Sequence, residues 1–543
     1  MADEKTDPIV PKQYLLTFCL VTVLFALWGF ANNFTDPMVK VFKDVFAISN
    51  MQSSFVQMAF YGGYATMAIP AALFIRKYSY KSGIIVGLLL FAIGAFISIP
   101  AANTINFWLF ISGLYILTFG LAFLETTANP FILSMGPEKT STLRLNLAQA
   151  FNPIGSLGGA FIAASFVMTN VHVAEFKADV NGFKDELSIM KAEDDSELAV
   201  LPFLKAKERE RKNDATAKAY VYAKAADAAG TEYAPLQQAI MDLEDGKIES
   251  FQDMKLPALK EKAAELLGAG AASVGVDEAL RDFREGKIAS YQEMEFSELQ
   301  RHDLNLVSTT YMTLGCIVLA TLVVFLIKKM PKAAADDDDE DLNIGATVGR
   351  LFRNPRYIGG VVAQMFYVGA QIMVWTFIIQ YAENELGMDN ATAANHQIVA
   401  LVIFLAFRFI CTAFLRYVSP GKLLAVLALF GIAFTLGAIH LEGMIGLYSL
   451  MMISACMSLM FPTIYGIALE GIGQDAKLGS AGLILAIVGA VWLTGFQGRI
   501  LDLETFMGTT ATRGSFYLSV GCFIIIAIYG LFCRNPRSKP VAA

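Results

Sequence analysis

Apolar residues fill the chain in long stretches, and most charges lie in the shorter stretches between them. A helix needs roughly 20 mostly apolar residues to cross the hydrocarbon core of a bilayer. Twelve stretches have that length, at 14–36, 53–75, 83–102, 107–133, 146–168, 306–327, 357–381, 396–415, 423–440, 444–468, 480–499 and 515–533. The pattern therefore predicts an all-α membrane protein with twelve transmembrane helices.

The amino-acid composition supports this interpretation. Hydrophobic residues make up 55% of the chain and charged residues 17%, whereas charged residues average about 25% in soluble domains. The net charge of −7 indicates little about partners, because much of it comes from polar stretches such as 336–341. We expect the lipid bilayer to surround the spans, and we expect no nucleic-acid partner.

Lysine and arginine are distributed unequally between the two sides of the predicted bundle. With an even number of spans, both termini lie on the same side. That side carries 19 Lys and Arg residues in its tails and loops, whereas the short loops of the other side carry four. Because positive residues gather in short cytoplasmic loops, the sequence predicts that both termini are cytoplasmic.

The spans divide six and six around a polar linker. The halves show weak symmetry, since Asn129-Pro130 in span 4 and Phe461-Pro462 in span 10 are each followed by a charged loop. Internal repeats of this kind place a central site between the halves of many secondary transporters. The predicted segments are helices 1–5 at 1–169, a periplasmic helical insertion at 170–305, helix 6 at 306–327, a cytoplasmic linker at 328–356, and helices 7–12 at 357–543.

The insertion at 170–305 is the unusual part of the chain. It is rich in Ala, Lys, Glu and Asp, and residues 242–254 match residues 282–294 at a spacing of 40. Apolar residues near the first copy fall on one helical face, so we interpret the insertion as a two-unit helical cap. A role in gating, a role in partner docking and a tolerated surface insertion all remain open.

Signatures of cofactor and metal chemistry are missing from the sequence pattern. The four histidines, at 172, 302, 396 and 440, lie at span ends or in loops without the spacing of metal ligands. No G-x-x-x-x-G-K-[ST] motif occurs, which argues against transport driven by ATP. We therefore expect no metal, no cofactor and no enzymatic activity.

Two carboxylates lie within apolar stretches. Glu125 is in the middle of the stretch 107–133, with no Lys or Arg nearby in sequence, and Asp36 closes the first span. A carboxylate in hydrocarbon costs several kcal/mol, so such a group faces the protein interior or a water-filled cavity. Two such acids predict a transporter that handles protons, although each acid could instead make a hydrogen bond between helices.

Most other polar residues of the spans are amides, accompanied by two tryptophans. Each amide alone could be a hydrogen bond that packs helices together, but the set as a whole suits a neutral polyol, whose hydroxyls bond to amides and whose C–H face lies on an indole. No Lys or Arg lies near a span centre except Arg408, toward the cytoplasmic end of span 8, which disfavours an anionic substrate. The candidate substrate contacts are Trp28, Asn32, Asn33, Asn129, Gln149, Asn152, Gln364, Gln371 and Trp375.

Several motifs resemble the bacterial L-fucose:proton symporters of the major facilitator superfamily. They cover both halves of the chain: LWGFANNFTDP at 27–37, LETTANP at 124–130, SMGPE at 134–138, RLNLAQAFNP at 144–153, QMFYVGAQ at 364–371, FPTI at 461–464 and GQD at 473–475. Members of that family have a short connection between spans 5 and 6, so the resemblance does not explain the insertion.

The resemblance implies the major facilitator superfamily fold and a carrier that works by alternating access. It implies import of L-fucose or a related neutral hexose with a proton, by a monomer in the cell inner membrane. It also implies that Asp36 and Glu125 are the protonatable pair, with Trp28, Asn33 and Trp375 among the residues around the sugar.

Other functions stay open at this stage. The sugar could be glucose or galactose, although the related glucose/galactose carriers differ around span 1. A proton-coupled exporter of the same fold and a sugar sensor without transport are also consistent with these residues. Uptake of a panel of labelled sugars into proteoliposomes, with and without a pH gradient, separates all of these.

Overall fold

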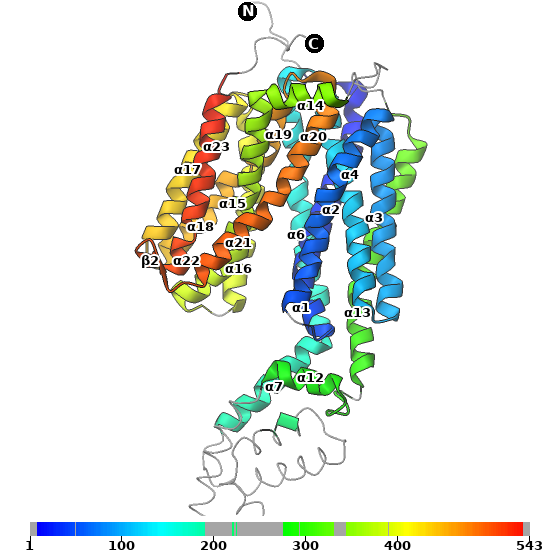
Figure 1. Cartoon of the computed structure of the whole chain (residues 1–543), viewed down its shortest axis with the longest axis vertical. Helices are drawn as coiled ribbons and strands as arrows, with labels where there is room; N and C mark the ends of the chain where they lie inside the picture. The colour runs from blue at the N-terminus through cyan, green and yellow to red at the C-terminus, as the bar shows by residue number, and fades with distance from the viewer. Residues whose placement is uncertain are drawn as a thin grey trace, which may run out of the picture.

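The computed structural model describes residues 8–48, 50–189, 220–221, 224, 275–292, 294–330, 344–388 and 390–535. Within these ranges, twelve helices or broken helices are long and apolar enough to cross a membrane, from Lys12–Val45 at the start to Ala511–Phe532 at the end. This confirms the predicted all-α class with twelve spans. In Figure 1 the start of α1 (Leu15–Val45) and the end of α23 (Tyr517–Phe532) lie at one end of the bundle, here called the terminal end, and α7 (His172–Ile189) and α12 (Val276–Arg284) of the insertion lie at the other, here called the insertion end.

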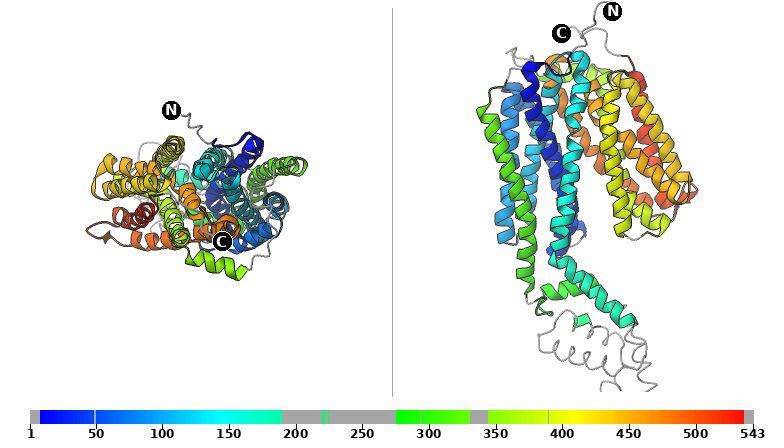
Figure 2. Two further views of the ribbon diagram at one scale, coloured as in Figure 1. Left: turned by 90° about the horizontal axis from the view of Figure 1, so that it is seen from above. Right: turned by 180° about the vertical axis from the view of Figure 1, so that it is seen from behind.

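The helices form two halves that lie side by side (Figures 1 and 2). The first half contains α1 (Leu15–Val45), α2 (Asn50–Lys77), α3 (Tyr80–Asn103), α4 (Phe107–Ser134), α5 (Ser141–Gln149), α6 (Asn152–Ile162) and α13 (Phe296–Ile327). The second contains α15 (Pro355–Leu386), α16 (Asn390–Phe414), α17 (Pro420–His440), α18 (Gly443–Met457), α19 (Met460–Leu469), α20 (Ala476–Leu485), α21 (Gly489–Leu501), α22 (Ala511–Gly514) and α23 (Tyr517–Phe532). Helix α14 (Ile344–Arg353) precedes this second half at the terminal end (Figure 1).

Short elements complete the fold. A two-stranded antiparallel ribbon, β1 (Thr505–Phe506) and β2 (Thr509–Thr510), joins α21 to α22, and α7 (His172–Ile189) and α12 (Val276–Arg284) belong to the insertion. One-turn or irregular helices are η1 (Lys12–Tyr14), η2 (Glu138–Thr140), η3 (Ala163–Val167), η4 (Met168–Asn170), η8 (Gly473–Asp475) and η9 (Ala486–Val488).

Three of the spans are broken near their middle. The fifth changes from α5 to α6 just before Pro153, and the tenth changes from α18 to α19 just before Pro462. Proline has no N–H to donate, and its ring clashes with the carbonyl of the preceding turn, so a helix breaks or bends ahead of it. The eleventh span is interrupted by η9, between α20 and α21. Irregular backbone at membrane depth is tolerated where it is buried in protein or lines a polar cavity.

Helices α1 and α6 cross at very short range. A Cβ atom added at Gly155 would lie 1.9 Å from the carbonyl oxygen of Ala26, and one added at Gly159 would lie 2.3 Å from that of Phe30. On the other helix, a Cβ atom at Gly29 would lie 2.2 Å from the carbonyl oxygen of Asn152. Small residues let membrane helices approach until their backbones touch. The crossing therefore fixes α1, and the polar residues it carries, against α6.

The two halves contact each other at the terminal end. The Asn146 amide donates a hydrogen bond of 3.2 Å to the Thr463 hydroxyl. The Lys477 ammonium lies 5.1 Å from the centre of the Tyr80 ring, a cation–π contact between α20 and α3. Figure 1 shows the halves side by side at this end and diverging toward the insertion end.

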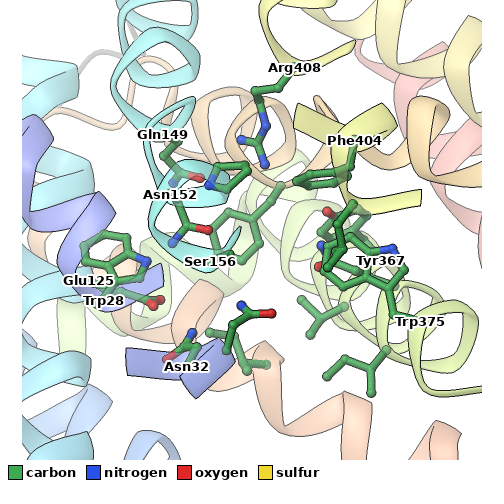
Figure 3. Close-up of a pocket in the computed structure, with 18 of the residues that line it drawn as sticks. Trp28, Asn32, Glu125, Gln149, Asn152, Ser156, Tyr367, Trp375, Phe404 and Arg408 are labelled. Atoms are coloured by element: carbon green, nitrogen blue, oxygen red, sulfur yellow. The ribbon is translucent and has the colours of Figure 1, made fainter. Parts of the chain in front are cut away.

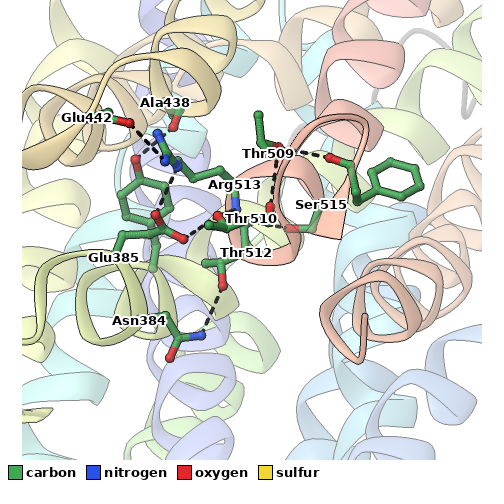
Figure 4. Close-up of polar contacts among 11 residues, drawn as sticks. Asn384, Glu385, Ala438, Glu442, Thr509, Thr510, Thr512, Arg513 and Ser515 are labelled. Atoms are coloured by element: carbon green, nitrogen blue, oxygen red, sulfur yellow. Dashed lines mark hydrogen bonds and ion pairs between the residues drawn. The ribbon is translucent and has the colours of Figure 1, made fainter. Parts of the chain in front are cut away.

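At the insertion end, the second half is tied together by charged and polar side chains (Figure 4). Arg513 forms ion pairs with Glu385 at 3.0 Å and with Glu442 at 3.5 Å. Thr510 donates to Glu385 at 2.5 Å, and Asn384 donates to Thr512 at 3.1 Å. These bonds link the end of α15 to α18 and to the β1–β2 ribbon, so this end of the second half is held as one unit.

The described part of the insertion, here called its base, includes α7, α12 and the start of α13. Aromatic rings form its small core: Phe176 stacks on Phe283 at 5.2 Å, and Phe283 meets Phe296 at 5.2 Å. Helix α13 begins at Phe296, so the helix that contains span 6 extends beyond the predicted start at 306. Most of the two-unit cap that the sequence predicts, including residues 242–254, lies outside the described residues.

The insertion also contacts the end of α1. The Lys177 ammonium lies 2.7 Å from the carboxylate of Asp44, and Gln300 donates a hydrogen bond of 2.6 Å to the carbonyl oxygen of Val45. Arg284 reaches the carbonyl oxygen of Ala47 at 3.4 Å. The insertion is therefore bound to the first span as well as to the two spans that it connects in sequence.

The α1–α6 crossing generates a stability prediction. We expect Gly155→Ala to lower the free energy of unfolding by about 1–3 kcal/mol, because its methyl group would overlap a backbone oxygen and force the helices apart. Gly158, on the same helix, faces only one atom at 3.7 Å. Gly158→Ala should be neutral or stabilising by up to about 1 kcal/mol, since alanine favours helix over glycine. Thermal melting in detergent measures both, and equal changes in the two variants would contradict a close crossing.

Candidate functional site

A cavity of about 190 Å³ lies between the halves. Its walls come from α1, α2, α4, α5 and α6 on one side and from α15, α16, α19 and η9 on the other, so all three broken spans reach it. Figure 3 shows its labelled residues facing each other across this space. The lining residues that carry nitrogen or oxygen in their side chains are Trp28, Asn32, Asn33, Tyr61, Tyr64, Glu125, Gln149, Asn152, Ser156, Tyr367, Gln371, Trp375 and Arg408.

Glu125 is the acidic residue among the residues that line the cavity. Its side chain is only 5% exposed, and the Tyr64 hydroxyl donates a hydrogen bond of 3.0 Å to its Oε1 atom. Within the described part of the chain, no Lys, Arg or His forms an ion pair with it. A buried carboxylate without a cation is costly while it is charged. The Glu125 carboxylate therefore forms no structural ion pair among the described residues, and its polar partner there is the Tyr64 hydroxyl.

Asn129 connects Glu125 to the next span. Its amide donates to the backbone oxygen of Glu125 at 2.9 Å, and its Oδ1 accepts a hydrogen bond of 2.7 Å from Gln149. Asn129 is fully buried and does not line the cavity. It therefore orients the Gln149 side chain, which does line the cavity.

The amides of α1 and α6 have few partners. Asn152 donates a hydrogen bond of 3.2 Å to the backbone oxygen of Phe25, and Asn33 reaches the backbone oxygen of Gly29 at 3.5 Å. The buried Oδ1 atom of Asn32 has no hydrogen-bond partner among the described residues. A buried polar atom without a partner costs about 1–3 kcal/mol. These amides are thus available to a polar ligand or to water.

Aromatic rings form two walls of the cavity. The Trp375 and Phe404 rings meet edge to face with centroids 5.0 Å apart, and the Trp375 N–H donates to the Ser454 hydroxyl at 3.2 Å. On the opposite side, Trp28 packs against Phe25 with centroids 4.2 Å apart. The hydrogen bond and the packing fix both indoles, so each half contributes one tryptophan to the cavity.

Arg408 is a site residue that the sequence reasoning placed away from the centre. It is 3% exposed, it lines the cavity, and its guanidinium lies 5.0 Å from the centre of the Phe404 ring (Figure 3). Two of its nitrogens, Nε and Nη1, have no hydrogen-bond partner among the described residues. Side chains on a helix point toward its N-terminus, and α16 runs toward the terminal end. The guanidinium therefore extends back into the cavity. The sequence did contain a signal for this residue, because an ionisable residue such as arginine within a membrane span is by default a candidate for a functional site.

The structure brings together most of the predicted site residues. Trp28, Asn32, Asn33, Glu125, Gln149, Asn152, Gln371 and Trp375 all line the cavity. Gln364 does not: it is fully buried on α15, where its amide has no partner among the described residues. Asp36 lies in α1 one turn beyond Asn32 and Asn33, and only its backbone is described.

The known proteins that are similar to this chain are membrane transporters. Residues 17–174 match the model of the Major Facilitator Superfamily. The chain is 39% identical to the L-fucose-proton symporter of Haemophilus influenzae over 522 residues, which cover 96% of this chain and 97% of that protein. It is 30% identical to the L-fucose-proton symporter of Escherichia coli over 96% of this chain and 94% of that protein.

A second group of relatives and a set of solved structures extend this result. The glucose/galactose transporter of Brucella abortus is 26% identical over 97% of this chain and 96% of that protein. The crystal structure of the E. coli fucose:proton symporter superposes with a TM-score of 0.69 at 27% identity, covering 96% of this chain and 100% of that one. A crystal structure of such a transporter in the outward conformation superposes with a TM-score of 0.67 at 28% identity, again covering 96% of this chain and 100% of that one.

The identity to the two fucose carriers and the structural likeness extend over both halves of the chain. The chain belongs to the L-fucose–proton symporter family of the major facilitator superfamily.

Proposed function

We propose that the chain imports L-fucose, or a closely related neutral hexose, together with a proton that is carried by Glu125 and Asp36. Membership of the family makes it a proton-coupled sugar importer. The choice of sugar and the residues that carry the proton are the proposed parts. The observation that carries the proposal is the buried Glu125 carboxylate, which lines an amide-rich cavity without a cation partner among the described residues.

The lining of the cavity supports a neutral sugar. Amide groups of Asn32, Gln149 and Asn152 can donate to and accept from hydroxyls, while Trp28 and Trp375 offer apolar ring faces to C–H groups. The cavity volume of about 190 Å³ is room for on the order of ten water-sized groups. That space suits a monosaccharide better than an oligosaccharide.

The Arg408 guanidinium in the cavity does not overturn the expectation of a neutral substrate. A buried guanidinium could attract an anion, but the same cavity also holds the carboxylate of Glu125. The two opposite charges leave the site close to neutral, so a neutral polyol remains the better ligand. The unpartnered N–H groups of Arg408 are then donors for sugar hydroxyls, and each hydrogen bond from a charged donor contributes about 1.5–3 kcal/mol.

The hydrogen bond from Tyr64 supports a proton-coupling role for Glu125. When charged, Glu125 accepts that bond, but it receives no compensation from a cation within the described residues. Protonation removes the charge and with it the cost of keeping the carboxylate away from water. We propose that Asp36, one helix turn beyond Asn32 on α1, exchanges protons with the same cavity and that the two acids titrate as a coupled pair.

The contacts between the halves support alternating access. The terminal end is closed by contacts such as Asn146–Thr463 and Tyr80–Lys477, and the halves diverge at the insertion end (Figure 1). If the termini are cytoplasmic, as the Lys and Arg distribution favours, this is an outward-facing state. We propose that the protein resides as a monomer in the bacterial inner membrane, with the insertion in the periplasm.

A related sugar is the second candidate. The full-length likeness to a glucose/galactose transporter at 26% identity favours D-glucose or D-galactose as the alternative substrate. Uptake of labelled L-fucose, D-glucose and D-galactose into proteoliposomes, under an imposed pH gradient, decides between them. Uptake of L-fucose in preference to the other two supports the first candidate, and the reverse preference supports the second.

The first prediction about transport concerns Glu125. We expect Glu125→Gln to abolish sugar accumulation driven by a pH gradient, with the internal-to-external concentration ratio falling to about 1, because an amide cannot release a proton. Exchange of internal for external sugar should persist, since the amide mimics the protonated acid. Glu138→Gln, at an exposed position beyond α4, is the matched control and should accumulate sugar normally. Full accumulation by Glu125→Gln would remove Glu125 from the coupling mechanism.

The second prediction concerns the indole wall. Trp375→Ala should weaken sugar binding by about 5- to 30-fold, corresponding to about 1–2 kcal/mol of lost apolar contact. The sugar-to-proton stoichiometry should not change, because the indole carries no charge. Trp108 is 58% exposed on the outside of α4, so Trp108→Ala serves as the control. Uncoupling of sugar from proton in Trp375→Ala, with unchanged affinity, would be inconsistent with a wall that only contacts the sugar.

The third prediction separates binding from stability at Arg408. Arg408→Met should raise the melting temperature of the sugar-free protein, because it removes a buried charge that has no anionic partner among the described residues. The same change should lower sugar affinity by at least about tenfold, since it removes charged donors from the cavity. Arg416→Met, at an exposed position near the end of the same span, should change neither quantity. A lower melting temperature with unchanged affinity would assign Arg408 a structural role instead.

A further inference from the structure

Three ligand-forming side chains meet at the insertion end, outside the cavity. His172 begins α7, which leads into the insertion, and His302 and Asp303 lie in the first turns of α13, which leads out of it. The two histidines are 130 residues apart in sequence, so no local spacing reveals the group. They are brought together because α7 and α13 pack against each other at the base of the insertion (Figure 1).

The three donor atoms converge on one point. The Nδ1 atoms of His172 and His302 are 2.9 Å apart, and they lie 3.4 Å and 3.2 Å, respectively, from the Oδ1 atom of Asp303. Zinc bonds of about 2.0–2.2 Å in tetrahedral geometry separate neighbouring ligand atoms by about 3.3–3.6 Å. The three observed separations are close to these ligand–ligand distances. The two Nδ1 atoms, which are the closest pair, would move apart by a few tenths of an ångström when an ion enters.

Asp303 is held in place as a buried ligand. It is fully buried, and its two oxygens accept hydrogen bonds of 2.9 Å from the backbone N–H groups of His172 and Val173. Such outer contacts fix the orientation of a metal ligand and are worth 10- to 100-fold in metal affinity where they have been tested. The Asp303 carboxylate therefore does not have to be reorganised when an ion binds.

The cluster is open to solvent on one side. The side chain of His302 is 44% exposed and that of His172 is 23% exposed, in contrast to the buried Asp303. An ion can therefore reach the three donors from water, and a water molecule can complete the coordination. Two imidazoles and one carboxylate suit zinc and other transition metals, whereas Ca²⁺ and Mg²⁺ prefer sites made of oxygen atoms alone.

We propose that His172, His302 and Asp303 bind a divalent transition-metal ion of the zinc type, with water as the fourth ligand. The ion would join α7 to α13 at the base of the insertion. Both helices also contact the end of α1, through Lys177 with Asp44 and through Gln300 with Val45. The proposal does not depend on the identity of the transported sugar, because none of the three ligands lines the cavity.

Zinc binding to the purified full-length protein tests the proposal. The affinity tag must be removed first, because a histidine tag binds zinc by itself. Calorimetry with Zn²⁺ alone should give one ion per chain, and His172→Ala and His302→Ala should each lower the affinity at least about tenfold, since losing a ligand costs no less than losing its outer contacts. His396→Ala and His440→Ala remove the other two histidines and should bind zinc like the unaltered protein.

Two further measurements keep the test decisive. Co²⁺ in place of Zn²⁺ should give the strong visible absorption of a tetrahedral site in the unaltered protein and not in the His172→Ala/His302→Ala variant. Zn²⁺ should also raise the melting temperature of the unaltered protein, because a ligand that binds only the folded state stabilises it. Absence of zinc binding at micromolar zinc, or equal binding by the double variant, would overturn the proposal and leave the cluster as a set of hydrogen bonds.

Discussion

Inside a bilayer every backbone N–H and C=O group needs a partner within the protein, since the hydrocarbon offers none. Unbroken helices meet this requirement by themselves, whereas an interrupted helix leaves backbone groups that need other partners. In this chain the interruptions before Pro153 and Pro462 and at η9 all occur beside the central cavity. The cavity supplies polar surroundings for the broken backbone, and Asn152, Phe461 and Ile487, which lie at or next to the breaks, line it.

The second organising feature is the distribution of charge within the cavity. Glu125 comes from the half that holds α4, and Arg408 comes from the half that holds α16. Each is buried, and each lacks an oppositely charged partner within the described residues. A molecule that rocks one half against the other changes the distance between these two charges. If Glu125 carries the proton, as we propose, its protonation would change the relative free energies of the two arrangements of the halves, which is the physical requirement for coupling.

The sequence predicted the class of the protein and most of the polar residues that line the cavity, because both depend on local pattern. Hydrophobic length located the twelve spans, and isolated polar residues within them located Glu125, Gln149 and Trp375. What the sequence did not show depends on properties that local pattern does not contain. The position of Arg408 in its span did not reveal that its long side chain extends back into the cavity, and the pattern did not show that Asn129 lies behind the cavity wall, where it accepts a hydrogen bond from Gln149. The pairing of His172 with His302 depends on how two distant helices pack.

The contacts between the insertion and α1 have a practical consequence. Asp44 and Val45 end the same rigid helix that carries Trp28 and Asn32 at the cavity, and the insertion base binds to that end. The base is therefore attached to the helix that carries one wall of the cavity. A fluorophore or an antibody fragment attached there would report any tilt of the first span, without a label inside the span itself.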